Sequence, residues 1–313
     1  MSQLLRPENL QDRLLFAIPK KGRLYETCLS LLSGADIQFK RAHRLDVALV
    51  TNFPIALVFL PAADIPLFIT DGNVDLAITG QDMVQEAGPA VSEGITEVLP
   101  LGFGKCKLQV QVPEAIESIK SVEDLVGKKI ATSFDLLSSQ FFRELEEKKG
   151  VPKLNDGRLH TSVQYLSGSV EAACALGLAD GIVDLVESGE TMRACGLKPI
   201  ATLLSSEAVL IRSTRPHERT DANLIQLITA RIRGVIAASK YVLCQYNIQK
   251  DNLAQALSIT PGRRAATVSP LRESDWYAVS SMVSRSDVAK IMDQLESVGA
   301  CDILILSIDN CRV

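Results

Sequence analysis

The sequence predicts an α/β protein in three parts: two similar α/β lobes with a cleft between them, and a separate C-terminal domain. Short apolar runs alternate with helix-length segments through most of the 313 residues, which is typical of α/β layering. A nine-residue motif occurs twice, which indicates that one α/β unit is repeated. We therefore expect lobe I at residues 1–108 with a return segment at 198–222, lobe II at 109–197, and a linker helix with the C-terminal domain at 223–313.

In both lobes the short apolar runs are interpreted as strands, and the longer segments between them as helices. In lobe I we expect strands at Leu14–Ile18, Ile55–Leu60 and Val74–Ile78, and helices at Leu24–Leu32 and Asp64–Asp71. In lobe II we expect strands at Leu108–Val112, Lys129–Thr132, Val163–Leu166 and Ile182–Val186, and helices near Ser121, at Phe141–Lys149 and at Val170–Leu176. The uncharged stretch Val47–Ala63 approaches the length of a membrane span, but its Thr, Asn and Pro residues indicate two buried strands.

The repeated motif is G-x-V-D-L-x-x-[ST]-G, at Gly72–Gly80 and again at Gly181–Gly189. Two buried strands can resemble each other by chance, but the Asp, the hydroxyl and the closing Gly are not core-filling residues. The motif therefore favours two related lobes, each with a strand that ends in a hydroxyl–Gly turn. Ligands of open α/β sheets bind beyond the carboxyl ends of strands, so Thr79-Gly80 and Ser188-Gly189 should both face the cleft.

The C-terminal part begins with a long helix expected at Ala222–Ser239. After it the order is strand, helix, strand, strand, helix, strand, which is the ferredoxin-like βαββαβ arrangement. The expected bounds are Tyr241–Tyr246, Asp251–Ser258, Ala266–Ser269, Tyr277–Val283, Asp287–Val298 and Asp302–Ile308.

Composition excludes several classes of protein. With 33 basic and 37 acidic residues the net charge is -4, and aromatic residues make up only 5%, so nucleic acid is not an expected partner. Seven cysteines without a CxxC pair or a metal-ligand spacing argue against a disulfide framework and favour a reduced, cytoplasmic setting. Met1–Arg13 lacks the apolar stretch of a secretory signal, and we expect no membrane partner.

The segment after the second copy of the motif's strand has the features of a phosphate site. Gly189 permits close backbone approach, the hydroxyls of Ser188 and Thr191 donate, and amides at the start of a helix point at one spot. Asp184 and Glu187 would repel a phosphate, so their expected partners are sugar hydroxyls or a bridging Mg²⁺. The pattern alone fits equally well with Ser188 as a simple N-cap and Glu190 in the first helical turn.

Other strand ends carry similar features. Thr132-Ser133 is a second hydroxyl turn, and Glu171 follows a third, although on its own Glu171 fits a capping role. The loop Pro19–Arg23 places Lys20, Lys21 and Arg23 around a Gly directly after a buried strand, which suits a polyphosphate, and Lys107 could add to the same field. An ordinary solvated loop is the alternative for these cations. Motifs of P-loop nucleotidases, dinucleotide dehydrogenases and serine hydrolases are absent from the sequence.

The ordered residues from Glu171 through Asp184 to Met192 resemble the signature of the ATP phosphoribosyltransferase family, which catalyses the first step of histidine biosynthesis. Further matches lie at Ala17–Leu24, Asp75-Leu76 with Thr79-Gly80, Ile130–Ser133 and Ile259–Gly262. The C-terminal part is similar to that of the long form of the family, which carries its own regulatory domain. The resemblance thus implies two periplasmic-binding-protein-like lobes and an ACT-like C-terminal domain.

The resemblance also implies a reaction. N1 of the ATP adenine attacks C1 of the ribose in phosphoribosyl pyrophosphate, and pyrophosphate leaves, with Mg²⁺ as cofactor. It assigns the 5-phosphate to Ser188, Gly189, Glu190 and Thr191, and the ribose hydroxyls and Mg²⁺ to Glu171 and Asp184. The catalytic residues it implies are Lys20, Arg23 and Asp184; the other substrate contacts are Glu187, Thr132, Ser133, Asp75, Thr79, Gly80 and Lys107.

For the C-terminal domain the resemblance implies feedback inhibition by histidine, bound at Gln245, Ala265 and Thr267. Gln245 replaces an acidic residue often found there. The resemblance also implies a homo-oligomer, with dimers that associate into hexamers. Two other classes of function are weighed against this enzyme: a two-lobed solute-binding protein without catalysis, and an amino-acid sensor attached to some other enzyme.

Overall fold

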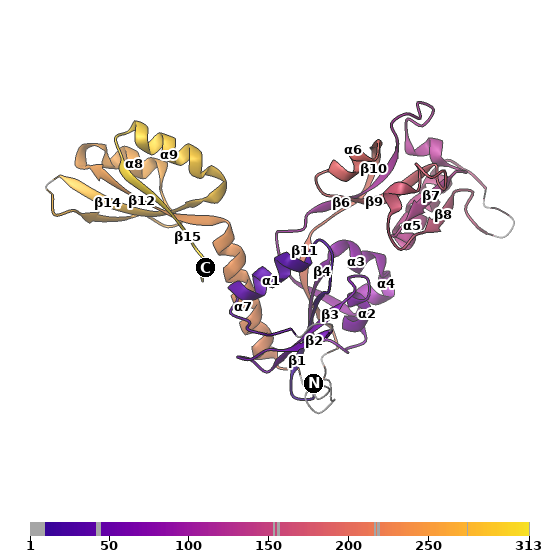
Figure 1. The fold of residues 1–313 in the computed structure, drawn as a ribbon, viewed down its shortest axis with the longest axis horizontal. Helices are drawn as coiled ribbons and strands as arrows, with labels where there is room; N and C mark the ends of the chain where they lie inside the picture. The colour runs from indigo at the N-terminus through magenta and orange to yellow at the C-terminus, as the bar shows by residue number, and fades with distance from the viewer. Residues whose placement is uncertain are drawn as a thin grey trace. The chain divides into compact units, whose positions relative to one another are not determined.

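A computed structural model describes residues 10–41, 45–152, 154, 157–215, 217, 220–273 and 275–312 (Figure 1). The chain divides into two compact units. The larger unit comprises Met1–Cys28 and Phe39–Asp221, and the smaller unit comprises Leu29–Gln38 and Ala222–Val313. No helix in the described ranges has both the length and the apolar character needed to cross a bilayer.

Lobe I of the larger unit is built on a six-stranded sheet in the order β2-β3-β1-β4-β11-β5. Strands β3, β1 and β4 are parallel, and β11 runs antiparallel to both of its neighbours. The strand bounds are β1 Leu14–Pro19, β2 Val47–Leu49, β3 Ile55–Leu60, β4 Leu76–Gly80, β5 Ile95–Pro100 and β11 Ala208–Ser213. The helices are α2 Ile65–Thr70, α3 Gln81–Glu86 and α4 Pro89–Ser92, and α1 Tyr25–Gly34 begins in this unit and passes into the smaller unit at Leu29. Strand β1 is buried almost throughout because its apolar side chains pack on both faces of the sheet.

Lobe II is built on a five-stranded sheet in the order β10-β6-β9-β7-β8. Its strands are β6 Cys106–Pro113, β7 Lys129–Thr132, β8 Ser162–Tyr165, β9 Gly181–Val186 and β10 Leu197–Ser206. The helical segments are η2 Val122–Leu125, α5 Asp135–Lys148, η3 Val170–Ala172 and α6 Glu190–Ala194. Phe142 of α5 is fully buried in a core that includes Leu108 and Val183 from the sheet.

The two lobes share one strand order and one pattern of directions. β3-β1-β4-β11-β5 in lobe I corresponds to β8-β7-β9-β6-β10 in lobe II: three parallel strands, then two strands joined by antiparallel pairing. The repeated sequence motif lies on the corresponding strands β4 and β9. In each copy the closing glycine is the N-cap of the next helix. The expectation of two related α/β lobes is therefore confirmed.

The expected lobe boundaries differ from the sheets in one segment. The return segment expected in lobe I at 198–222 is divided, because β10 pairs with β6 in lobe II and only β11 joins lobe I. Strand β10 keeps this pairing through two irregularities in register, near Pro199 and Thr202. The chain crosses between the lobes twice, at residues 101–105 and at Glu207.

The smaller unit contains α7 Ala222–Ser239 and a four-stranded sheet in the order β13-β14-β12-β15. Its elements are β12 Tyr241–Gln249, η4 Lys250–Asn252, α8 Leu253–Ile259, β13 Thr267–Pro270, β14 Trp276–Ser284, η5 Arg285–Asp287, α9 Val288–Ser297 and β15 Cys301–Ser307. Helices α8 and α9 cover one face of the sheet (Figure 1), and Val242, Cys244, Tyr246 and Ile248 of β12 are buried there. The expected ferredoxin-like order is confirmed.

Two expected helices are wrong in extent. The helix expected at Val170–Leu176 is only the short 3-10 helix η3, which follows Ser169 in a left-handed conformation and is succeeded by turns. Helix α5 begins six residues before the expected Phe141, at Asp135. Strands β5, β10 and β11 and helices α3 and α4 were not expected from the sequence.

Candidate functional site

A cavity of about 520 Å³ lies where the two lobes meet. Gln81, at the start of α3, lines it from lobe I, directly after Gly80. Ser188 and Gly189, directly after β9, line it from lobe II. A second cavity of about 330 Å³ shares these lobe II residues and adds Arg23 and Thr191. The Ser188-Gly189 turn after β9 and Gln81 after β4 therefore border a common space, whereas Thr79 and Gly80 themselves line neither cavity.

The turn before α6 is built around Gly189, which has a left-handed φ of 76°. A side chain at this position would be strained, and its Cβ would lie 2.8 Å from Nη1 of Arg193. The amide of Glu190 donates to Oγ of Ser188 over 3.3 Å, and Nη2 of Arg193 donates to the Ser188 carbonyl over 3.1 Å. Ser188 therefore stands before the N-cap Gly189 and accepts from the first amide of α6, so its hydroxyl hydrogen remains available as a donor.

Asp184 on β9 is half-buried, and burial raises the pKa of its carboxyl from the usual 3.8 to about 6. The amide of Leu185 donates to Oδ1 over 2.8 Å, which lowers the pKa, while the nearby charge of Glu171 on η3 raises it. Two neighbouring carboxylates of this kind attract hydroxyl donors or a cation. In the described ranges no cluster of three or more His, Cys, Asp or Glu side chains is arranged to hold a metal. Two carboxylates nevertheless fit Mg²⁺, which typically takes one or two from the protein and its other ligands from substrate oxygens and water.

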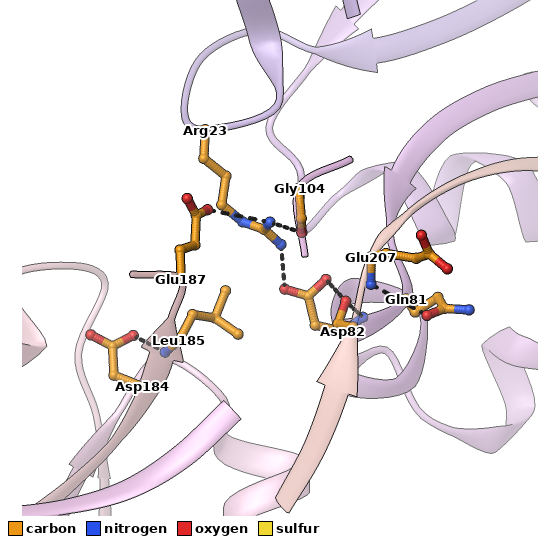
Figure 2. A network of polar contacts seen from close by, with 9 residues as sticks. Arg23, Gln81, Asp82, Gly104, Asp184, Leu185, Glu187 and Glu207 are labelled. Atoms are coloured by element: carbon orange, nitrogen blue, oxygen red, sulfur yellow. Dashed lines mark hydrogen bonds and ion pairs between the residues drawn. The ribbon is translucent and has the colours of Figure 1, made fainter. Parts of the chain in front are cut away.

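Arg23 spans the space between the lobes (Figure 2). Its Nη2 lies 3.2 Å from Oδ2 of Asp82 in lobe I, and its Nη1 lies 3.4 Å from Oε1 of Glu187 in lobe II. Nη1 also donates to the carbonyl of Gly104. Asp82 is 1% exposed, and no motif in the sequence marks it. The only local signal for Asp82 was its place two residues after Gly80, and its partners come from distant parts of the chain.

The other two cations expected at the site lie in different surroundings. Lys20 is half-exposed, and its Nζ lies 3.9 Å from Oδ2 of Asp46. Lys107 at the start of β6 is exposed and lines the larger cavity together with Lys105. Of the expected basic residues, the structure therefore places Arg23 and Lys107 at the two cavities.

The sequence and the fold of this chain are similar to those of known proteins. Residues 61–234 match the sequence model of the family described as ATP phosphoribosyltransferase, and residues 238–310 match the one described as HisG, C-terminal domain. The chain is 57% identical to the ATP phosphoribosyltransferase of Yarrowia lipolytica over 97% of its own length and 98% of the relative's. It is 52% identical to that of Saccharomyces cerevisiae, with the same coverage.

This chain belongs to the ATP phosphoribosyltransferase family. Membership places it among enzymes, not among solute-binding proteins that lack catalysis. A solved ATP phosphoribosyltransferase (HisG:HisZ) complex from Thermotoga maritima contains a chain of the same fold. The TM-score is 0.55 at 22% identity, over 70% of this chain and 98% of that one.

Two residues expected at the substrate site of this family have structural partners instead. Asp75 is 3% exposed at the amino end of β4, and its carboxylate accepts hydrogen bonds from the Leu15 amide over 2.8 Å and from the Thr220 hydroxyl. Thr132 is fully buried; its hydroxyl donates to the Val183 carbonyl over 2.7 Å and accepts from the Phe134 amide over 2.9 Å. Like Asp184 and Glu171, neither lines the two cavities, but Asp75 and Thr132 are also buried and use their hydrogen-bonding groups within the fold, and we therefore correct both assignments.

Three further expected residues lie at or near strand ends. Thr79 is fully buried on β4, and its hydroxyl has no hydrogen-bond partner among the described residues. Gly80 has an ordinary φ of -87° but no room for a side chain, because an added Cβ would collide with Oδ1 of Asp82. Ser133 is half-buried immediately after β7.

The smaller unit has a cavity of about 300 Å³ on the face of its sheet opposite α8 and α9. Thr267, Ser280 and Gln245 lie in register on three neighbouring strands and line this cavity, as does Asp302 of β15. Nε2 of Gln245 lies 3.5 Å from Oγ of Ser280. Two of the three residues expected to bind an inhibitor are thus together. Ala265 is not part of this lining; its backbone lies within 3.0 Å of the place where a Cβ on Gly262 would be.

Proposed function

We propose that this chain transfers the phosphoribosyl group of phosphoribosyl pyrophosphate to N1 of ATP, the first step of histidine biosynthesis. The N1 lone pair forms the new bond to C1 of the ribose, and the electrons of the C1–O bond leave with pyrophosphate. The observation that carries the proposal is the space bordered by Gln81 after β4 and by Ser188 and Gly189 after β9, in a chain of this family.

Lobe II supplies the groups for the phosphorylated sugar. The amides of Glu190 and Thr191 and the hydroxyl of Ser188 surround the turn at Gly189 and suit the 5-phosphate. Asp184 and Glu171 accept hydrogen bonds from the ribose hydroxyls. This arrangement fixes the sugar with C1 toward the cavity, so positioning contributes much of the rate.

Both lobes supply positive charge, Arg23 from lobe I and Lys107 from β6 of lobe II. Arg23 and Lys107 line the cavities and would bind phosphate oxygens of the departing pyrophosphate or of ATP. Lys20 is proposed for the same role, in exchange for its ion pair with Asp46. Bound Mg²⁺ would screen the negative charge of pyrophosphate, with Asp184 and Glu171 as its protein ligands. No side chain at the site is needed as a general base for N1, whose lone pair is already free.

The direct test mixes the protein with ATP, phosphoribosyl pyrophosphate and Mg²⁺ and follows the absorbance of the adduct. Adduct and pyrophosphate should form in equal amounts. If neither forms, while a known ATP phosphoribosyltransferase is active in the same buffer, the proposed activity is wrong.

We further propose that histidine inhibits the enzyme by binding in the cavity of the smaller unit. Thr267 and Ser280 offer hydroxyls, Gln245 an amide, and Asp302 a carboxylate for the ammonium group. Asp302→Asn should raise the histidine concentration for half inhibition about tenfold, as expected for loss of one charge-assisted contact. Uninhibited turnover should not change. An unaltered inhibition curve would remove Asp302 from the site.

Assembly into dimers and hexamers and a cytoplasmic location remain predictions from the family resemblance and the cysteine usage.

A further inference from the structure

The most constrained charged group at the site is the carboxylate of Asp82, in the first turn of α3. It is 1% exposed, and a buried carboxylate is stable only when paired and hydrogen-bonded. The Ser206 hydroxyl donates to Oδ1 over 2.9 Å, and Oγ of Ser206 in turn accepts a hydrogen bond from the Asp82 amide over 3.0 Å. Oδ2 faces Nη2 of Arg23 over 3.2 Å. Both oxygens of Asp82 are therefore fixed, one by the end of β10 and one by the arginine.

The guanidinium of Arg23 has two unlike sides (Figure 2). One side meets the buried Asp82. On the other, Nη1 meets the carbonyl of Gly104 and the carboxylate of Glu187, whose side chain is 49% exposed. An ion pair with so exposed a partner contributes little to stability, so water or another anion can replace Glu187. The buried carboxylate of Asp82 cannot be replaced by water or another anion in this way.

We propose that Asp82, held by Ser206, is a positioning residue that keeps the Nη1 side of Arg23 turned toward the cavity. Glu187 occupies the place of a phosphate or pyrophosphate group, and the substrate or product anion displaces it. The inference rests on the proposed role of Arg23 as a phosphate ligand. A guanidinium in a fixed orientation loses less freedom when it binds a phosphate with two parallel hydrogen bonds.

Because two carboxylates flank the guanidinium of Arg23, the direction in which each substitution changes pyrophosphate affinity tests the proposal. If their charges acted only by repelling an anion, neutralising either one would tighten pyrophosphate binding. The proposal requires opposite signs: Asp82→Asn weakens binding because Arg23 loses its orientation, whereas Glu187→Gln strengthens it because a competitor is removed.

The probe is inorganic pyrophosphate with Mg²⁺, titrated by calorimetry into the full-length protein, so that no turnover is needed. We expect the Kd to rise about tenfold in Asp82→Asn and to fall about threefold in Glu187→Gln, the sizes typical of one charge-assisted contact and of one exposed ion pair. Ser206→Ala keeps the charge of Asp82 but frees it, and should raise the Kd about threefold. In the double variant Arg23→Gln/Asp82→Asn the Kd should match that of Arg23→Gln alone, because Asp82 acts through Arg23.

Glu146→Gln is the matched control. Glu146 is also a buried carboxylate, 3% exposed, but its partners are the amides of His160 and Thr161 and the Thr161 hydroxyl in lobe II. Its substitution should lower the melting temperature without changing the Kd for pyrophosphate. If Asp82→Asn does not fold, Ser206→Ala decides the question.

The outcomes separate the two proposals. Equal pyrophosphate affinity in wild type and Arg23→Gln would overturn the role of Arg23 in the proposed function. If Arg23→Gln binds pyrophosphate more weakly than wild type, but Asp82→Asn binds it equally well or more tightly, the positioning role alone is overturned. An unchanged Kd for pyrophosphate in Ser206→Ala would show that the Ser206 hydroxyl does not fix the Asp82 carboxylate.

Discussion

The two lobes have the same strand order, but they use the same residue types for different purposes. The Asp of the repeated motif illustrates this. In lobe I, Asp75 is 3% exposed and accepts hydrogen bonds from Leu15 and Thr220, so it stabilises the fold. In lobe II, Asp184 is more accessible, receives one hydrogen bond from its neighbour Leu185, and has a pKa of about 6. The partners of a carboxylate, and not its place in a motif, decide whether it is available for chemistry.

The strand ends differ in the same way. The loop after β1 in lobe I carries Lys20 and Arg23, whereas β7 in lobe II ends at Thr132, whose hydroxyl is used within the fold. Lobe II instead offers amides and carboxylates around α6. In the proposed reaction Arg23 of lobe I contributes positive charge for phosphates and lobe II holds the sugar, so a complete site would require both lobes.

The largest expected effect comes from Asp184→Asn. Without the carboxylate the ribose hydroxyls lose a charged acceptor, and kcat/KM should fall about 10²- to 10³-fold, as for loss of one preorganised electrostatic contact. Steady-state kinetics of adduct formation measure this. The melting temperature should not fall, because the substitution removes a carboxylate that burial disfavours. Retained activity would exclude Asp184 from the site.

The same carboxyl predicts how stability depends on pH. Its folded pKa, about 6, lies above the ordinary 3.8, so the folded state binds the proton more tightly than the unfolded state. Wild type therefore loses stability relative to Asp184→Asn as pH rises from about 4 to about 7, by roughly 2–3 kcal/mol. Urea unfolding of both proteins at several pH values tests this. A difference that does not vary with pH would contradict the raised pKa.

Asp75→Asn should lower stability and leave activity nearly unchanged, which is the opposite of the result expected for Asp184→Asn. Asparagine has one acceptor oxygen in place of two, so either the Leu15 amide or the Thr220 hydroxyl loses its partner. We expect the free energy of unfolding to fall by about 1–3 kcal/mol. Turnover per folded molecule should stay within about twofold, since a structural hydrogen bond does not touch substrate. A large loss of kcat in folded protein would restore Asp75 to the substrate site.

A smaller effect is expected from Gly189→Ala. A Cβ at this left-handed position strains the turn and approaches Nη1 of Arg193, so the amides of α6 should no longer converge on one phosphate. We expect KM for phosphoribosyl pyrophosphate to rise about tenfold, or 1.4 kcal/mol. Gly196→Ala is the matched control, because Gly196 has a similar φ of 66° but open space around it. An equal rise of KM in both variants would attribute the effect to strain alone.

Most elements were predictable where local sequence and tertiary structure agree. The bounds of Ile55–Leu60 and Ala222–Ser239 match β3 and α7, because one is a continuous apolar run and the other a long helical pattern. Strand β10 was missed since its register irregularities break the alternation of buried and exposed residues. The helix expected at Val170–Leu176 is limited to η3, because turns replace helix after Ala172 and the apolar pattern alone does not show this.

The site was predictable only in part. The turn at Ser188-Gly189 has a local signature, and the structure places it at the cavity. Asp82 has none, because its partners Arg23 and Ser206 lie 59 and 124 residues away along the chain. Thr132 was misassigned for the same reason: sequence shows that a hydroxyl follows a strand, but not that the Val183 carbonyl accepts its proton.

The most direct test of the two-lobe account is a crystal structure of this protein with phosphoribosyl pyrophosphate and Mg²⁺. The account predicts the 5-phosphate on the amides of Glu190 and Thr191, the ribose hydroxyls on Asp184, and pyrophosphate on Arg23 where Glu187 now lies. Substrate bound to one lobe only, with no contact to the residues that follow β4 or β1, would contradict it.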